Sequence, residues 1–82
     1  MLSPTQERVA QIIAEVLSLS PEDAASLRQL EGYKKLAAWT SARHVEIIVA
    51  IEEEFQVEID DASILRLKDV ASIAEYVDTH GR

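Results

Sequence analysis

The chain has 82 residues, with 15 acidic and 8 basic side chains, a formal net charge of −7 and no cysteine. A chain of this length supports one modest core, so we expect one domain over residues 1–82 and favour a binding or carrier module over an enzyme. The absence of cysteine excludes disulfides and thiolate metal sites, and the acidity argues against nucleic acid or anionic membrane surfaces as partners.

The first predicted element is a helix that begins directly after Ser3 and ends near Leu19. Ser3 is a good N-cap, Pro4 suits the first helical position, and Gln6 is placed to complete a capping box. The residues that follow repeat at helical spacing and form one apolar stripe. That stripe consists of Val9, Ile12, Ile13, Val16 and Leu17.

Ser20 and Pro21 repeat the same start signal and predict a shorter helix through about Leu30. The helical pattern is lost over residues 31–39. We expect Leu36 and Trp39 to anchor this connection to the core, and for Trp39 we favour this role over that of a ligand platform.

A second long helix is predicted from Ser41 to about Phe55, because Thr40 and Ser41 are both good N-cap residues. Its apolar side chains cover more than one stripe, which is typical of a helix that is central or partly exposed for binding. These side chains are Val45, Ile47, Ile48, Ile51 and Phe55.

Two further elements are expected after this helix: a short turn of helix over residues 62–65, capped by Asp60 and Asp61, and a last helix capped by Asp69. No strand alternation occurs, so the sequence predicts an all-α bundle with three main helices and one or two short ones. Seven apolar residues at helical spacing should form most of the core. They are Ile13, Val16, Ile48, Ile51, Phe55, Ile73 and Val77.

Acidic side chains gather in one part of the chain, between Ser41 and Asp61, where Arg43 is the single lysine or arginine. Acidity can simply keep a protein soluble, but this clustering is stronger than solubility requires and indicates a basic partner. The cluster consists of Glu46, Glu52, Glu53, Glu54, Glu58, Asp60 and Asp61.

Residues 36–55, LAAWTSARHVEIIVAIEEEF, resemble the acyl and peptidyl carrier proteins, in which a helix opens with Asp-Ser-Leu and runs through Val-Glu to a Glu-Glu-Glu-Phe end. Residues 57–61 and 67–77 are similar to the segments that follow this helix in that family. Trp39 and the pair His44 and Val45 resemble the residues found in discrete carriers of specialised pathways more than those of the housekeeping fatty-acid carrier. The resemblance covers nearly the whole chain.

The resemblance implies a small four-helix bundle of the acyl-carrier type that catalyses nothing itself. Ser41 would receive 4′-phosphopantetheine from coenzyme A through a phosphodiester, and the thiol of that arm would hold an acyl or aminoacyl group as a thioester. Its partners would be a phosphopantetheinyl transferase, a loading ligase or transferase, and synthases of fatty acid, polyketide or nonribosomal peptide biosynthesis. We expect a cytoplasmic monomer, since no signal peptide or long apolar run is present.

The sequence departs from the family pattern beside the serine, with Thr40-Ser41-Ala42 in place of Asp-Ser-Leu and a positive charge at Arg43. In the family the following helix is the docking surface for basic patches of partner enzymes. The resemblance therefore implies partner docking at Arg43, Glu46, Val49, Glu53 and Glu54.

Three alternatives remain open. Ser41 could serve only as an N-cap, and the chain could be an unmodified carrier-fold protein that acts as a non-covalent interaction or regulatory module. A small hydrolase could use Ser41 and His44, which lie three residues apart on one helix. We expect His44 at the surface instead, because no orienting acid or nucleophile elbow accompanies it.

Overall fold

The computed structural model describes residues 2–28 and 37–80, and this part of the chain is mostly helical, with turns and loops between the helices. The helices, in chain order, are α1 (Pro4–Leu17), α2 (Pro21–Arg28), α3 (Ser41–Phe55), α4 (Asp61–Ile64) and α5 (Val70–His80). The prediction of a small all-α bundle is confirmed.

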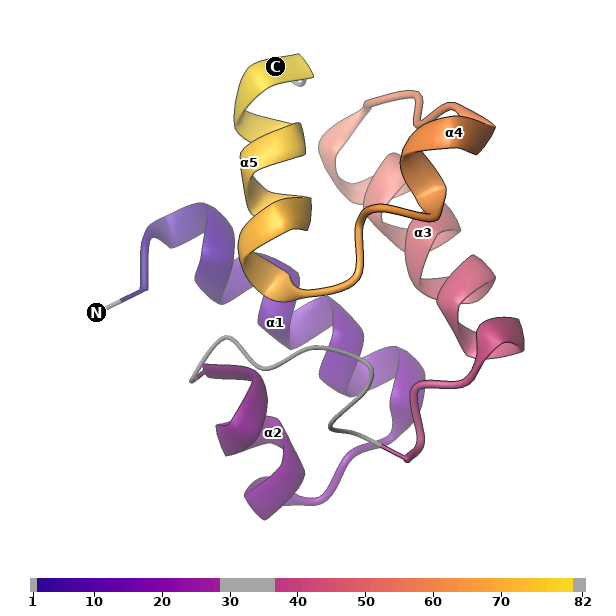
Figure 1. The fold of residues 1–82 in the computed structure, drawn as a ribbon. Helices are drawn as coiled ribbons and strands as arrows, with labels where there is room; N and C mark the ends of the chain where they lie inside the picture. Colours follow the sequence, from indigo (N-terminus) through magenta and orange to yellow (C-terminus); the bar gives the residue numbers. More distant parts are fainter. Residues whose placement is uncertain (1, 29–36, 81–82) are drawn as a thin grey trace.

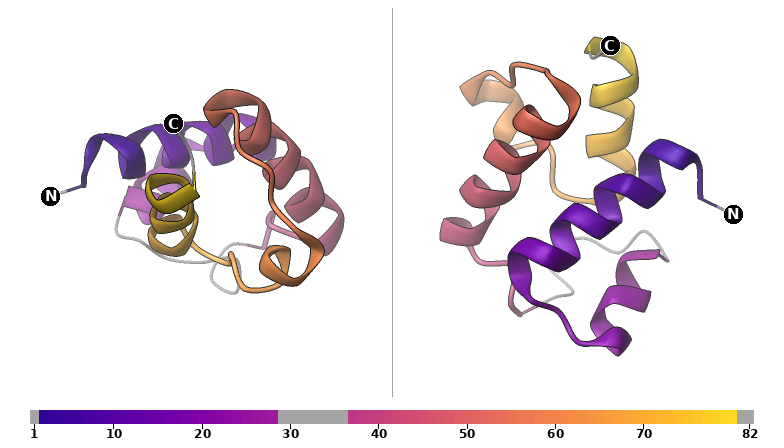
Figure 2. Two further views of the ribbon diagram at one scale, coloured as in Figure 1. Left: turned by 90° about the horizontal axis from the view of Figure 1, so that it is seen from above. Right: turned by 180° about the vertical axis from the view of Figure 1, so that it is seen from behind.

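Helix α1 occupies the middle of the bundle and contacts α2, α3 and α5 (Figure 1). Helix α4 lies beside α3 in all three views, so that α3 has α1 on one flank and α4 on another (Figure 2). The core is enclosed mainly by α1, α3 and α5, which contribute most of its buried side chains.

Helix α1 begins as the sequence predicts and ends earlier. The Ser3 hydroxyl accepts from the Gln6 amide at 3.1 Å, and the Gln6 side chain accepts from the Ser3 amide at 2.9 Å, which completes the capping box. The helix was expected to end near Leu19, but Ser18 adopts a left-handed conformation with φ of 52°. The amide of Leu19 then bonds back to the last turn of α1, which closes the helix two residues sooner.

The connection from α2 to α3 is anchored by Trp39, as predicted, since this side chain is only 2% exposed. Helix α2 ends at Arg28 and buries Leu27 completely. The predicted helix end at Leu30 and the predicted anchor Leu36 lie outside the described residues.

Five of the seven predicted core residues are buried and two are not, and these five are a minority of the buried apolar side chains, so the seven do not form most of the core. Phe55 is only partly buried, because it is the last residue of α3 and the chain turns away at Gln56, which is left-handed with φ of 55°. Val16 is also partly buried, since it lines a surface depression with Ala50 and Glu53. The buried members of the set are Ile13, Ile48, Ile51, Ile73 and Val77.

Candidate functional site

Ser41 is the first residue of α3 and is exposed. The cap of this helix is Thr40, which is extended (φ −85°, ψ 173°) and whose hydroxyl accepts from the Arg43 amide at 3.3 Å. Trp39, buried directly before Thr40, fixes the chain where it enters the helix. Within residues 2–28 and 37–80 no hydrogen bond uses the Ser41 hydroxyl, so capping does not require it.

A pocket of about 440 Å³, which we call the Ser41 pocket, opens beside this hydroxyl between α3 and α4. Its walls include two exposed apolar side chains, Val45 at 55% and Leu65 at 72%, and Lys68 brings a positive charge to it. Leu65 and Lys68 could not be predicted from sequence as neighbours of Ser41, because nothing in their local pattern places them there. The lining residues are Thr40, Ser41, His44, Val45, Ile64, Leu65 and Lys68.

His44 is half-buried rather than on the surface, which corrects the expectation from sequence. The indole Nε1–H of Trp39 donates to His44 Nδ1 at 2.9 Å, and His44 Nε2 lies 2.9 Å from the carbonyl oxygen of Ile64. Because an indole N–H can only donate, Nδ1 must be the acceptor, and we assign the proton to Nε2. With both ring nitrogens engaged, His44 is not placed to act as a base for Ser41.

The acids of α3 have different surroundings. Glu54 pairs with Arg8 of α1 through two bonds of 2.9 and 3.0 Å, and the hydrogen bonds from Arg8 lower the pKa of Glu54. Glu52 is half-buried and accepts from the backbone amide of Ile59 at 2.8 Å. Both carboxylates therefore hold parts of the fold together.

Asp60 also has a structural role, as the N-cap of α4. Its carboxylate accepts from the Ser63 amide at 2.9 Å. Hydrogen bonds from the Ser63 side chain first, and then from the backbone amide, lower the pKa of Asp60. The acidic cluster seen in sequence thus contains carboxylates that bond to another segment or cap a helix (Glu52, Glu54 and Asp60) alongside exposed acids such as Glu53.

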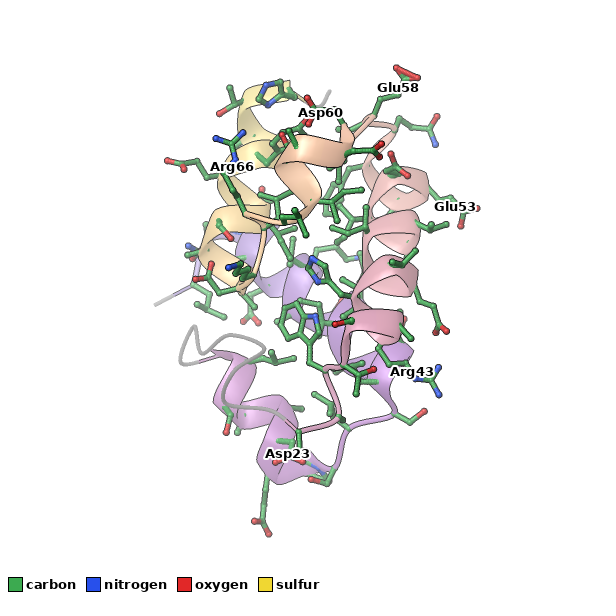
Figure 3. All side chains as sticks on the ribbon, turned by 45° about the vertical axis from the view of Figure 1, so that its right-hand side comes forward. Asp23, Arg43, Glu53, Glu58, Asp60 and Arg66 are labelled. Carbon is green, nitrogen blue, oxygen red and sulfur yellow. The ribbon has the colours of Figure 1, made fainter. Side chains whose placement is uncertain are left out.

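The outward face of α3 carries Glu46, Val49 and Glu53, which are spaced three and four residues apart and so share one side of the helix. Val49 is 47% exposed, and Arg43 pairs with Glu46 at 2.8 Å on the same exposed surface. Arg43 and Glu53 both point away from the bundle (Figure 3). Of the five residues implied as a docking surface, only Glu54 turns aside, toward α1.

Comparison with known proteins identifies the class of the domain. A family model described as "Phosphopantetheine attachment site" matches residues 40–77, which begin at the cap of α3 and end within α5. The acyl carrier protein of Zymomonas mobilis subsp. mobilis is 34% identical over 83 aligned residues, which cover 96% of this chain and 97% of that protein. The chain belongs to the acyl carrier protein family, whose members are carriers and not enzymes.

The family carries a covalent 4′-phosphopantetheine, and the geometry around Ser41 fits such a group. The hydroxyl is exposed and has no capping bond, and the first amides of a helix favour a phosphate beside them. The Ser41 pocket offers apolar walls and the Lys68 ammonium next to that position. Across the described helices, none has the length and apolar character needed to cross a bilayer.

Proposed function

We propose that Ser41 is the attachment point of the phosphopantetheine arm, and that the chain carries an acyl or aminoacyl group and presents it to partner enzymes. The observation that carries this proposal is the position of Ser41: exposed at the start of α3, within the matched residues 40–77, and relieved of capping by Thr40. The arm supplies the thiol on which the cargo is held as a thioester, since the chain has no cysteine.

The residues of the chain bind and orient rather than react. The N-terminal amides of α3 and the Lys68 side chain provide positive electrostatic potential beside the Ser41 oxygen, which favours a phosphodiester there. Val45 and Leu65 give that position an apolar flank. Thr40 keeps the helix start intact whether or not Ser41 is modified.

Partner enzymes dock, on this proposal, on the outward face of α3, through Glu46, Val49 and Glu53 with Arg43 at its edge. Exposed charges of this kind steer encounters and speed association more than they add affinity. Glu54 takes part less directly, because its carboxylate is held by Arg8. We further propose that the chain works as a single-domain monomer in the cytoplasm.

The test is modification by a broad-specificity phosphopantetheinyl transferase with coenzyme A, followed by intact mass. Wild-type protein should gain one phosphopantetheinyl group and Ser41→Ala none. Ser20→Ala is the matched control, since Ser20 accepts from the Asp23 amide at a helix start outside the matched residues. Wild-type protein that stays unmodified with every transferase tried would favour the alternative, an unmodified interaction or regulatory module.

A further inference from the structure

The ring of His44 joins two segments that meet at the Ser41 pocket. On one side it accepts from Trp39, in the connection that leads into α3, and on the other it contacts the carbonyl of Ile64, the last residue of α4. The Trp39 and His44 rings are also close, with centroids 5.8 Å apart. Both bonds are short and involve side chains that are at least half-buried.

The bond to Ile64 has a clear physical role. A helix leaves its last carbonyls without partners inside the helix, and α4 has only four residues. The Ile64 carbonyl has a weak alternative donor, the Leu67 amide at 3.4 Å, against 2.9 Å for His44. His44 therefore holds the end of α4, directly before Leu65, against the first turns of α3.

We propose that His44 is a positioning residue of the carrier site: as the neutral Nε2–H tautomer it ties α4 to Trp39 and so fixes the α4 wall of the Ser41 pocket. This wall consists of Ile64 and Leu65. The tautomer follows from the two partners: the Trp39 indole only donates, so Nδ1 is unprotonated, and Nε2 carries the proton that the Ile64 carbonyl accepts. The effect on modification rests on the proposed function, whereas the bridge itself does not.

The test compares two substitutions that differ in hydrogen bonding. His44→Gln offers an amide oxygen for the Trp39 indole and an amide N–H for the Ile64 carbonyl, whereas His44→Leu offers neither. We expect His44→Gln to retain most of the transferase kcat/KM. His44→Leu should lose roughly tenfold or more, up to the roughly hundredfold that misplacement of about 1 Å can cost. His80→Gln and His80→Leu are controls that should change nothing, because His80 contacts Tyr76 in α5.

Nuclear magnetic resonance tests the bridge without any transferase. Long-range proton–nitrogen spectra of the wild-type protein at neutral pH should show His44 with a proton on Nε2 and none on Nδ1. The single indole N–H resonance, that of Trp39, should keep its hydrogen-bonded shift in His44→Gln and lose it in His44→Leu. The amides of Ile64 and Leu65 should shift in His44→Leu far more than in His44→Gln.

A loss of stability alone must be distinguished from a loss of positioning. Val77→Ala removes a buried side chain of α5 away from the Ser41 pocket, and should lower the melting temperature without slowing modification. If His44→Leu fails to fold, His44→Asn replaces it, because its shorter amide cannot reach both partners. A proton on Nδ1, or equal effects of the bridging and non-bridging substitutions, would overturn the proposal. If wild-type protein is never modified, the proposed function fails and the spectra still decide the bridge.

Discussion

Two single substitutions, Thr40→Ala and Ser41→Ala, should have different effects: the first should lower stability, and the second should prevent modification. Thr40 caps α3, and loss of an N-cap costs about 0.5–2 kcal/mol. The capping bond is long, at 3.3 Å, so we expect the lower half of that range, about 0.5–1 kcal/mol. For a domain of this size that lowers the melting temperature by roughly 2–8 °C. Ser41→Ala removes no capping bond and adds a better helix former, so its stability should stay within about 0.5 kcal/mol of wild type.

The assay is thermal unfolding followed by far-ultraviolet circular dichroism, with modification of the same samples measured by mass. Thr40→Ala should unfold earlier and still accept the arm at Ser41, whereas Ser41→Ala should unfold normally and accept nothing. An equal fall in melting temperature for Ser41→Ala and Thr40→Ala would contradict this prediction. That result would make Ser41 the working cap and support the interpretation of Ser41 as a purely structural residue.

Three further predictions concern the core, the docking face and pH. Ile51→Ala should lower the free energy of unfolding, measured by denaturant unfolding, by about 2–5 kcal/mol. Phe55→Ala should lower it by less than Ile51→Ala does, and by less than the roughly 3–5 kcal/mol of a fully buried ring. A larger loss for Phe55→Ala would mean that α3 is rotated. Glu53→Lys should slow modification at low salt and Arg43→Asp should speed it, and both effects should shrink as the salt concentration rises. Modification rates that change with neither substitution would mean that docking depends on apolar contacts. Folding lowers the pKa of Glu54 below its value in the unfolded chain, which is about 4.3. The ion pair with Arg8 therefore stabilises the fold above that pH, and this stabilisation is lost as the pH falls through the lower pKa of the folded state. The melting temperatures of wild type and Glu54→Gln should therefore differ at neutral pH and converge in acid, and a difference independent of pH would contradict this origin.

Much of the fold could be predicted because its signals are local. The capping box of Ser3 and Gln6, the cap at Thr40 and the cap at Asp60 each depend on residues three apart. Helical spacing likewise identified part of the core, since it fixes which side chains share a face. The end of α1 was less predictable, because the left-handed conformation of Ser18 follows from how Leu19 packs on the core.

The features that the sequence could not reveal join residues far apart along the chain. Glu54 is separated from Arg8 by 46 positions, so the sequence assigned it to the docking surface although it ties α3 to α1. His44 lies 20 positions from Ile64, and only the arrangement of α3 and α4 shows that its ring is shared between them. Leu65 and Lys68 join the Ser41 pocket for the same reason.

The most direct test of the carrier function is the intact mass of this protein purified from cells of its native host, with peptide mapping of the modified residue. Attachment of the arm at Ser41 predicts a species heavier than the bare chain by one phosphopantetheinyl group, with or without cargo, and places that group on the peptide that contains Ser41. A population that carries only the mass of the bare chain, or an arm on any other residue, would contradict it.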